Sequence, residues 1–139
     1  MRNPVELAHL FADVMNSHDA NRFAGLVSEN YVNHNPAVAP GLAGVTAFMG
    51  HWFDTLSDTS VSVEDAFSAG DRVVGRYTYR ARHTGPFVGV SASGAEITMR
   101  SIDIWRVEND RFDEHWDELN TLEIFQQMGA VPMQRGGAL

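Results

Sequence analysis

The sequence contains no cysteine among its 139 residues. Disulfide bonds, zinc sites built on thiolates, iron–sulfur clusters and cysteine nucleophiles are therefore excluded. No apolar run approaches the roughly 18 residues that a membrane-spanning helix needs. The N-terminal segment carries Pro4 and Glu6 where a signal peptide needs an unbroken apolar region. We therefore expect a cytoplasmic protein that has no membrane partner.

Basic charge is also scarce, since 10 Lys and Arg side chains stand against 18 Asp and Glu, for a formal net charge of −8. Nucleic acids and anionic membranes both bind basic surfaces, so this balance argues against them as partners. Repeats, low-complexity tracts and linkers are missing as well. The length predicts one domain, with its core over about residues 1–130 and a C-terminal tail over 131–139.

Two helices are expected at the N-terminal end. Asn3 followed by Pro4 is a typical helix start, because proline fits the first turn of a helix. Apolar residues then recur at helical spacing over residues 5–15. Asp19 or Asn21 is suited to cap a second, short helix that continues to about residue 27.

The next two segments differ sharply in composition. Residues 28–41, SENYVNHNPAVAPG, are rich in Asn, Pro and Gly and are predicted to form a loop. This loop carries Tyr31, Asn33 and His34, whose polar groups are able to point into a cavity. Residues 41–56 show apolar positions at helical spacing, with a stripe broad enough to be buried on more than one side. They predict a third helix.

From Thr59 onward apolar and polar residues alternate, which is typical of β-strands. A last helix is predicted from about Asn120, a good N-cap residue, to Met128, with Gly129 as its C-cap. Between Thr59 and this last helix, the alternation predicts four long antiparallel strands, over 61–70, 72–83, 97–107 and 111–119.

The predicted order of three helices, four strands and a final helix is typical of an α+β fold. A strongly curved antiparallel sheet wrapped against the N-terminal helices would form a cone with a cavity at its open end. Gly75, Gly85, Gly89 and Gly94 are candidates for the bends or bulges that such curvature needs.

Side chains alternate across a strand, so each of the last two strands has a predicted inner face. The inner face of the strand over 97–107 carries Met99, Ser101, Asp103, Trp105 and Val107. The inner face of the strand over 111–119 carries Asp113, His115, Asp117 and Leu119.

The pairing register of these two strands decides whether the carboxyl groups meet. A turn centred on three residues places Asp103 opposite Asp117 and Trp105 opposite His115, with Cβ atoms roughly 5 Å apart. A turn with two central residues places Asp103 opposite Trp116 instead. The sequence is compatible with either register.

Two carboxyl groups on an apolar wall raise each other's proton affinity, and burial raises it further. One of them could stay ionised as a general base, while the other held a proton and donated a hydrogen bond to a carbonyl oxygen. Such a pair is suited to removing a proton next to a ketone. Further hydrogen bonds are available from His115, His34, Tyr31 and Asn33.

Simpler structural roles are open for the same residues. Asp117 could form a salt bridge with an arginine at a strand end, and Asp103 could pair with Arg100 or Arg106 on the outer face. His34 and His115 could be structural histidines. The six histidines show no HxH or HExxH spacing, so no metal site is expected.

Five segments resemble the SnoaL-like polyketide cyclases, within the wider ketosteroid-isomerase-like and nuclear-transport-factor-two-like superfamily. They follow the family's order and nearly its spacing, and the combination of HTGxFxG, DIWR, EHWD and QQMG is fairly specific. The segments are YVNHNP (31–36), GLAGVTAFM (41–49), HTGPFVGVSASG (83–94), SIDIWRVENDRFDEHWDELN (101–120) and TLEIFQQMGA (121–130).

The resemblance implies the α+β cone, a deep apolar pocket, no metal or organic cofactor, and a homo-oligomer formed through the outer sheet face. Family cyclases close a ring by intramolecular aldol condensation, with an aspartate that matches Asp117 as the acid/base. Asp103 stands where the cyclases have a histidine, and Asn120 where many members have an acid. Related epoxide hydrolases use an Arg-x-Asp pair, but Arg100 and Asp103 have the wrong spacing to share a face.

We therefore expect a cofactor-independent enzyme that acts by acid/base chemistry on a bulky, mostly apolar carbonyl compound. Its partners would be a small apolar or aromatic ligand and further copies of the chain, as a dimer or tetramer. The alternatives are a non-catalytic ligand-binding or assembly domain, and an epoxide or ester hydrolase. The predicted catalytic residues are Asp117, Asp103 and His115, and the predicted substrate-binding residues are His34, Asn33, Tyr31, Trp52, Trp105 and Trp116.

Overall fold

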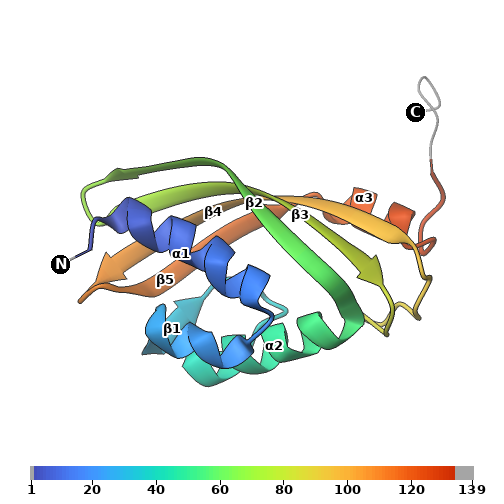
Figure 1. Cartoon of the computed structure of the whole chain (residues 1–139), viewed down its shortest axis with the longest axis horizontal. Coiled ribbons are helices and arrows are strands. Elements are labelled where there is room, and N and C mark those ends of the chain that lie inside the picture. The colour runs from blue at the N-terminus through green and yellow to red at the C-terminus, as the bar shows by residue number, and fades with distance from the viewer. Residues whose placement is uncertain (1, 134–139) are drawn as a thin grey trace.

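The computed structural model describes residues 2–133, so positions 134–139 of the predicted tail lie outside the described residues. A curved, open sheet forms one layer, and the helices α1 and α2 lie on its concave side (Figure 1). None of the helices within residues 2–133 is long and apolar enough to cross a membrane. The elements are α1 (Pro4–Ser17), η1 (Ala20–Gly25), β1 (Val27–Asn33), α2 (Gly41–Thr55), β2 (Leu56–Ala69), β3 (Arg72–His83), β4 (Glu96–Glu108), β5 (Arg111–Leu119) and α3 (Thr121–Gln127).

The sheet has five strands in the order β1-β5-β4-β3-β2. The predicted α+β class and the four antiparallel strands are confirmed, but the purely antiparallel sheet was wrong, because β1 joins it in parallel to β5. The prediction of a loop over 28–41 is corrected for the same reason. Its first residues pair with β5, with Val32 opposite Glu114 and Asn33 opposite His115. Edge pairing overrides the Asn-rich local composition.

The first helix begins at the predicted residues, whereas the second helical segment differs from the prediction. Asn3 caps α1, since its side chain accepts a hydrogen bond from the Val5 N–H. Asp19 caps the second segment, which is a 3-10 helix that ends at Gly25 rather than an α-helix reaching residue 27. The chain enters β1 at Val27, and this short segment therefore delivers the polar residues of β1 to the sheet edge next to β5.

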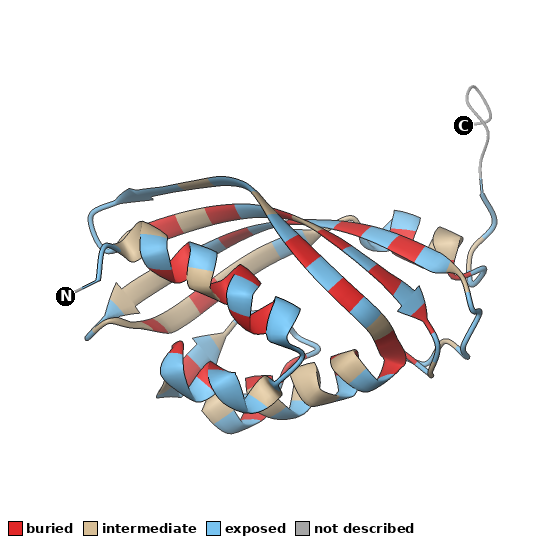
Figure 2. Ribbon diagram, in the orientation of Figure 1, coloured by how far each residue is buried: buried red, intermediate tan, exposed pale blue. Residues whose placement is uncertain are grey.

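The core lies between α1 and the concave face of the sheet, where every second residue of β3, and of β4 as far as Trp105, is buried (Figure 2). On α1, the Phe11 ring packs on those of Tyr77 and Trp105, with centroids 5.0 and 5.3 Å apart. The Tyr77 hydroxyl donates to the Ala8 carbonyl at 2.7 Å. Gly75 leaves room for this packing, because a Cβ there would meet the Tyr77 ring at 2.4–2.6 Å. These contacts fix β3 and β4 under α1.

The β4–β5 hairpin uses both of the predicted registers. Next to its two-residue turn, Val107 pairs with Phe112, which is the register of the shorter turn. The register then shifts between Arg106 and Val107, and from there Asp103 pairs with Asp117. A β-bulge of this kind adds one residue to one strand, and here that residue is Asp113.

The bulge corrects the predicted inner face of β5. Phe112 is buried and stacks on Trp105, with ring centroids 4.2 Å apart. Asp113 faces the other side, where it pairs with Arg106 and accepts a hydrogen bond from the Ser28 hydroxyl at 2.7 Å. The extra residue therefore lets Phe112 and His115 both point inward, although their spacing is odd.

Candidate functional site

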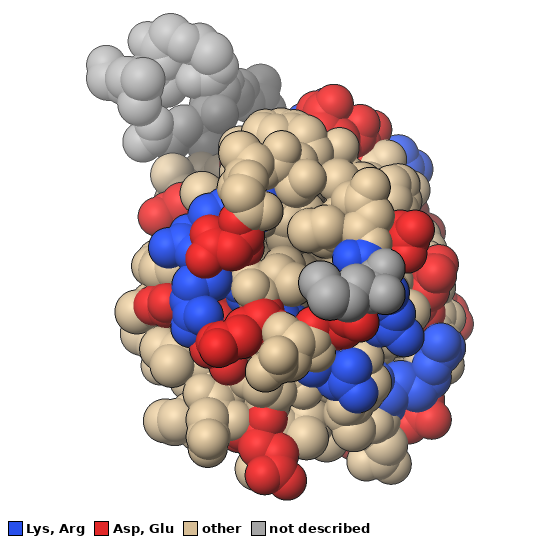
Figure 3. All heavy atoms as spheres, turned by 90° about the vertical axis from the view of Figure 1, so that its left-hand side faces the viewer, with Lys and Arg blue, Asp and Glu red and all other residues tan. Residues whose placement is uncertain are grey.

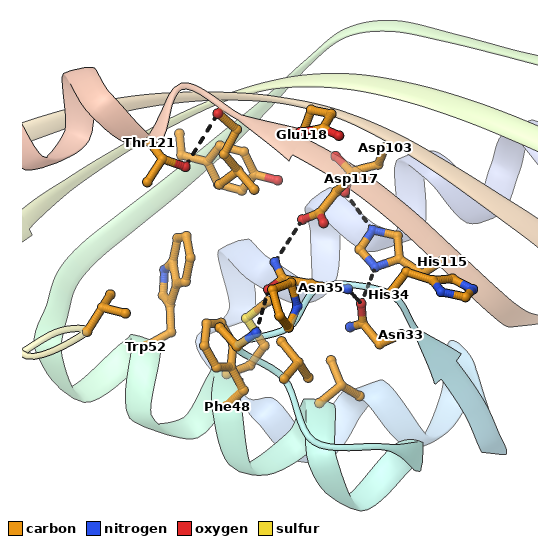
Figure 4. Close-up of a pocket in the computed structure, with 18 of the residues that line it drawn as sticks. Asn33, His34, Asn35, Phe48, Trp52, Asp103, His115, Asp117, Glu118 and Thr121 are labelled. Atoms are coloured by element: carbon orange, nitrogen blue, oxygen red, sulfur yellow. Dashed lines mark hydrogen bonds and ion pairs between the residues drawn. The ribbon is translucent and has the colours of Figure 1, made fainter.

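A cavity of roughly 430 Å³ lies between the concave face of the sheet and α2. Its wall is mostly aromatic and aliphatic, and its polar groups come from β1, β4, β5 and the loop after β1 (Figure 4). Seven of the predicted site residues line this cavity: Tyr31, Asn33, His34, Trp52, Asp103, His115 and Asp117.

Asp103 and His115 are joined within this wall. The alternation of β4 turns Asp103 inward, and it is only 2% exposed. The register shift brings β5 alongside so that His115 Nε2 lies 2.7 Å from Asp103 Oδ1. The Ser101 hydroxyl donates to Asp103 Oδ2 at 2.6 Å, and the Tyr79 hydroxyl lies 2.8 Å from the Ser101 oxygen. Asp103 is thus a buried carboxyl group whose two oxygens are both engaged.

The hydrogen-bond partners fix one proton of His115. The Asn35 backbone N–H donates to Asn33 Oδ1 at 2.9 Å, so that Asn33 atom is an acceptor. The same oxygen lies 3.1 Å from His115 Nδ1, which must therefore carry a hydrogen and donate it. The short contact to Asp103 holds one further proton. Two arrangements satisfy it: an imidazolium beside a carboxylate, or an imidazole beside a carboxylic acid.

Asp117 lies beside this pair but keeps a free oxygen. Its Oδ2 accepts a hydrogen bond from the Asn35 side-chain amide at 3.2 Å. That amide is held in orientation, because Asn35 Oδ1 accepts the Ala37 N–H at 2.9 Å. Burial in the apolar wall raises the pKa of Asp117, and the neighbouring Asp103 adds to this, while His115 and Asn35 oppose it. A half-buried carboxyl group with raised proton affinity is suited to take up and return a proton.

Asn35 was missed in the sequence, although the signal was present. Asn33 and Asn35 stand two positions apart at the end of β1, and such residues share one side of an extended chain. Both side chains point toward β5, as Figure 4 shows. His34, between them, has the opposite direction: its Nε2 bonds Glu114 at 2.7 Å and its ring stacks on Trp116.

Tyr31 and Trp52 line the cavity as predicted, each with its polar atom engaged. The Tyr31 hydroxyl accepts a hydrogen bond from Trp105 Nε1 at 3.2 Å, and burial raises the pKa of Tyr31 well above its usual range. Trp52 Nε1 donates to the Thr59 hydroxyl at 3.0 Å. Both side chains therefore present ring surface to the cavity, and the Tyr31 hydroxyl keeps its hydrogen to donate, because it bonds no acceptor within residues 2–133.

The predicted wall positions of Trp105 and Trp116 are corrected, since neither lines the cavity. Trp105 lies in the core, stacked between Phe112 and His115 at centroid distances of 4.2 and 5.1 Å. Trp116 pairs with Ile104 on the outer face of the sheet, where the Arg72 guanidinium lies 5.3 Å from its ring. Parity explains the second error, because Trp116 alternates with the inward-pointing His115.

The acids are not held by arginines. Arg100 pairs with Glu123 and Arg106 with Asp113, both away from the cavity, so the predicted alternative of surface salt bridges is wrong for Asp103. An epoxide hydrolase would need an arginine beside the acids. None lines the cavity among residues 2–133.

Asp103, His115 and Asp117 could also be read as a metal site, because each offers a ligand atom within 4.8 Å of the others. Histidine and carboxylate are donors that zinc and iron accept. However, the contact between His115 Nε2 and Asp103 is already bridged by a proton. A cation would have to displace that proton, so the arrangement is better suited to holding a proton than a metal.

The comparisons with known proteins agree with this fold. Over 91% of its length the chain matches the structure of TsrD from Streptomyces laurentii, covering 94% of that chain with 33% identity and a TM-score of 0.85. AclR from Streptomyces galilaeus matches over 96% of this chain and 89% of its own, with 22% identity and a TM-score of 0.84. No curated protein sequence matches the chain.

A further structure carries the family's name. A SnoaL-like polyketide cyclase from Jannaschia sp. CCS1 matches over 93% of each chain, with 19% identity and a TM-score of 0.81. The family model for SnoaL-like polyketide cyclases matches residues 5–128, which include every residue of the polar cluster described above. The chain belongs to the SnoaL-like polyketide cyclase family.

Proposed function

We propose that the protein is a cofactor-independent enzyme that moves protons next to the carbonyl group of a bulky, mostly apolar compound. The reaction would be an aldol condensation of the polyketide cyclase type. The observation that carries this proposal is Asp117: a carboxyl group with a free oxygen and a raised pKa, half-buried in an apolar cavity beside the Asp103–His115 pair.

In the proposed reaction the Asp117 carboxylate removes a proton from the carbon next to the carbonyl group, which leaves an enolate and a neutral Asp117. The Tyr31 hydroxyl, which keeps its hydrogen to donate, stabilises the enolate oxygen by a hydrogen bond. The enolate carbon then attacks a second carbonyl carbon of the same molecule. Asp117 returns its proton to the alkoxide that forms, so no proton is gained or lost overall.

The first step can be measured without the natural substrate. In deuterated water, a general base that works on ketones accelerates the exchange of protons next to the carbonyl group of 2-tetralone, a bicyclic aromatic ketone. NMR follows this exchange directly. We expect acceleration by the wild-type protein and a loss of about 10²-fold or more in Asp117→Asn, the range typical of removing a general base.

Asp113→Asn is the matched control. It makes the same change on the same strand, but Asp113 pairs with Arg106 outside the cavity. This variant should keep the wild-type exchange rate. Equal rates in the wild-type protein and Asp117→Asn, with both folded by circular dichroism, would refute the catalytic role of Asp117 and favour a non-catalytic binding domain.

A further inference from the structure

The charged side chains of the cavity wall are predominantly negative. Among residues 2–133, its wall includes Asp103, Asp117 and the exposed Glu118, but neither Arg nor Lys. The arginines nearest in sequence point elsewhere: Arg100 forms a bidentate pair with Glu123, and Arg106 pairs with Asp113 on the outer face. The cavity thus offers a ligand negative charge without a positive side chain to balance it.

His115 attracts Asp117 but is already paired with Asp103, so it balances only one of the two carboxyl groups. Its Nε2 is 2.7 Å from Asp103 and its Nδ1 donates to Asn33, so both nitrogens are engaged within the wall. In either protonation arrangement the Asp103–His115 pair is neutral as a unit. Asp117 is bonded to the uncharged amide of Asn35, and its second oxygen makes no hydrogen bond within the described residues. One carboxylate is therefore left uncompensated at the polar end of the cavity.

The rest of the wall is mostly apolar, and aromatic rings make up a large part of it. Trp52 and Phe87 meet edge to face at a centroid distance of 5.5 Å, and Phe48 and Phe87 do so at 6.3 Å. The rings of Trp52 and Tyr79 are tilted, with centroids 5.8 Å apart. The indole N–H of Trp52 is used by Thr59 and is not turned toward a ligand. Ring faces carry partial negative charge and attract cations. The polar end and the aromatic wall therefore favour the same sign of ligand charge.

We propose that the ligand of this cavity is an aromatic carbonyl compound that carries a positively charged nitrogen, which lies beside Asp117 and against the aromatic wall. The carbonyl part of this statement rests on the proposed function, whereas the cationic nitrogen rests on the charges and rings of the cavity. Such a nitrogen would be an amine, a quaternary ammonium or a protonated heteroaromatic ring.

Two physical effects support this choice. A carboxylate removed from water without a partner is costly, and a cation that enters with the ligand offsets that cost. The net charge of −8 over the whole chain also attracts cations and repels anions at long range. A ligand with a free carboxylate or phosphate would meet Asp117 with no positive group to separate them.

The test compares two ketones of the same shape. Para-(trimethylammoniomethyl)acetophenone and para-neopentylacetophenone differ in one atom, nitrogen against carbon, and in one unit of charge. Isothermal titration calorimetry on the wild-type protein at neutral pH measures both. We expect the ammonium ketone to bind at least about tenfold more tightly, because Asp117 and the ring faces attract its charge at short range.

Two variants locate the effect. Asp117→Asn should bring the two affinities close to equality, while Asp113→Asn, whose carboxyl group lies outside the cavity, should keep the wild-type ratio. Equal affinities in the wild-type protein would overturn the proposal. An unchanged ratio in folded Asp117→Asn would overturn it as well, and so would equally tight binding of the anionic para-(carboxymethyl)acetophenone.

The acid/base role of Asp117 and the cationic ligand can be refuted independently of each other. Exchange of 2-tetralone protons that depends on Asp117, together with equal binding of the two ketones, would leave the acid/base role intact and remove the cationic ligand. A tenfold ammonium preference without any catalysed exchange would keep the cation site and make the protein a binding module.

Discussion

At the scale of single residues, the site depends on which proton sits on which atom. Asn33 holds the hydrogen of His115 Nδ1, because its own oxygen is fixed as an acceptor by the Asn35 N–H. The remaining proton is then confined to the contact between His115 and Asp103. Asn33 is a positioning residue in this account: it contacts His115, and through His115 it acts on the proton affinity of Asp117.

Replacing Asn33 should remove the acceptor that fixes the tautomer of His115. In Asn33→Ala, His115 Nδ1 loses its acceptor, and the ring is free to turn or to change tautomer. We expect ¹⁵N NMR of His115 to show a protonated Nδ1 in the wild-type protein and a mixture of tautomers in the variant. Ketone exchange should fall by about tenfold while binding of the ketone changes little.

Asn30→Ala is the control for this prediction. It makes the same change on the same strand, but Asn30 is exposed and does not line the cavity. It should leave the His115 resonances and the exchange rate unchanged. Identical His115 spectra in the wild-type protein and Asn33→Ala would contradict the positioning role of Asn33.

At the scale of elements, the sequence predicted what depends on local periodicity and missed what depends on pairing. The long strands β3 and β4 alternate cleanly, so their buried faces were predictable. The sequence predicts a loop at β1, because this strand is stabilised by β5, which follows it by about 80 residues, rather than by its own composition. Asp103 could be placed on an inner face from β4 alone.

The neighbours of Asp103 could not be settled in the same way. Both registers fit the hairpin sequence, and the bulge at Asp113 allows each of them over part of its length. Asp117 and His115 come to face Asp103 only beyond that bulge. The direction of Trp116 depends on the same pairing, and so does its absence from the cavity. A single inserted residue thus decides the composition of the site.

At the scale of the whole molecule, the outer face of the sheet carries an apolar row across four strands. Phe67, Val74, Ile104 and Trp116 are successive cross-strand partners on β2, β3, β4 and β5. Phe67 and Ile104 are 58% and 39% exposed. Elsewhere the surface is mixed: Figure 3 shows arginines interspersed with acids at the end of the molecule that bears the β2–β3 and β4–β5 turns.

This row supports the expected homo-oligomer, because an exposed apolar row across a sheet favours pairing with a second sheet. We expect a dimer by light scattering coupled to size-exclusion chromatography at micromolar concentration. Ile104→Arg should give a monomer that stays folded. Leu122→Arg changes an exposed apolar residue on α3, outside the row, and should stay dimeric. A monomeric wild-type protein would contradict this role of the outer face.

The central claim concerns Asp117, and the pH dependence of ketone exchange tests it most directly. The groups around Asp117 are Asp103, His115, Glu118 and Asn35, and burial is the main cause that raises its pKa above the usual value of 3.8. A base works when ionised, so the exchange rate should be high above this pKa and fall as the pH drops through it.

The same titration can be followed at the carboxyl carbon of Asp117 by ¹³C NMR. We expect the rate curve and the carboxyl curve to share one midpoint, above 3.8. A rate that stays constant while Asp117 takes up its proton, or that follows a different group, would contradict the assignment of Asp117 as the general base.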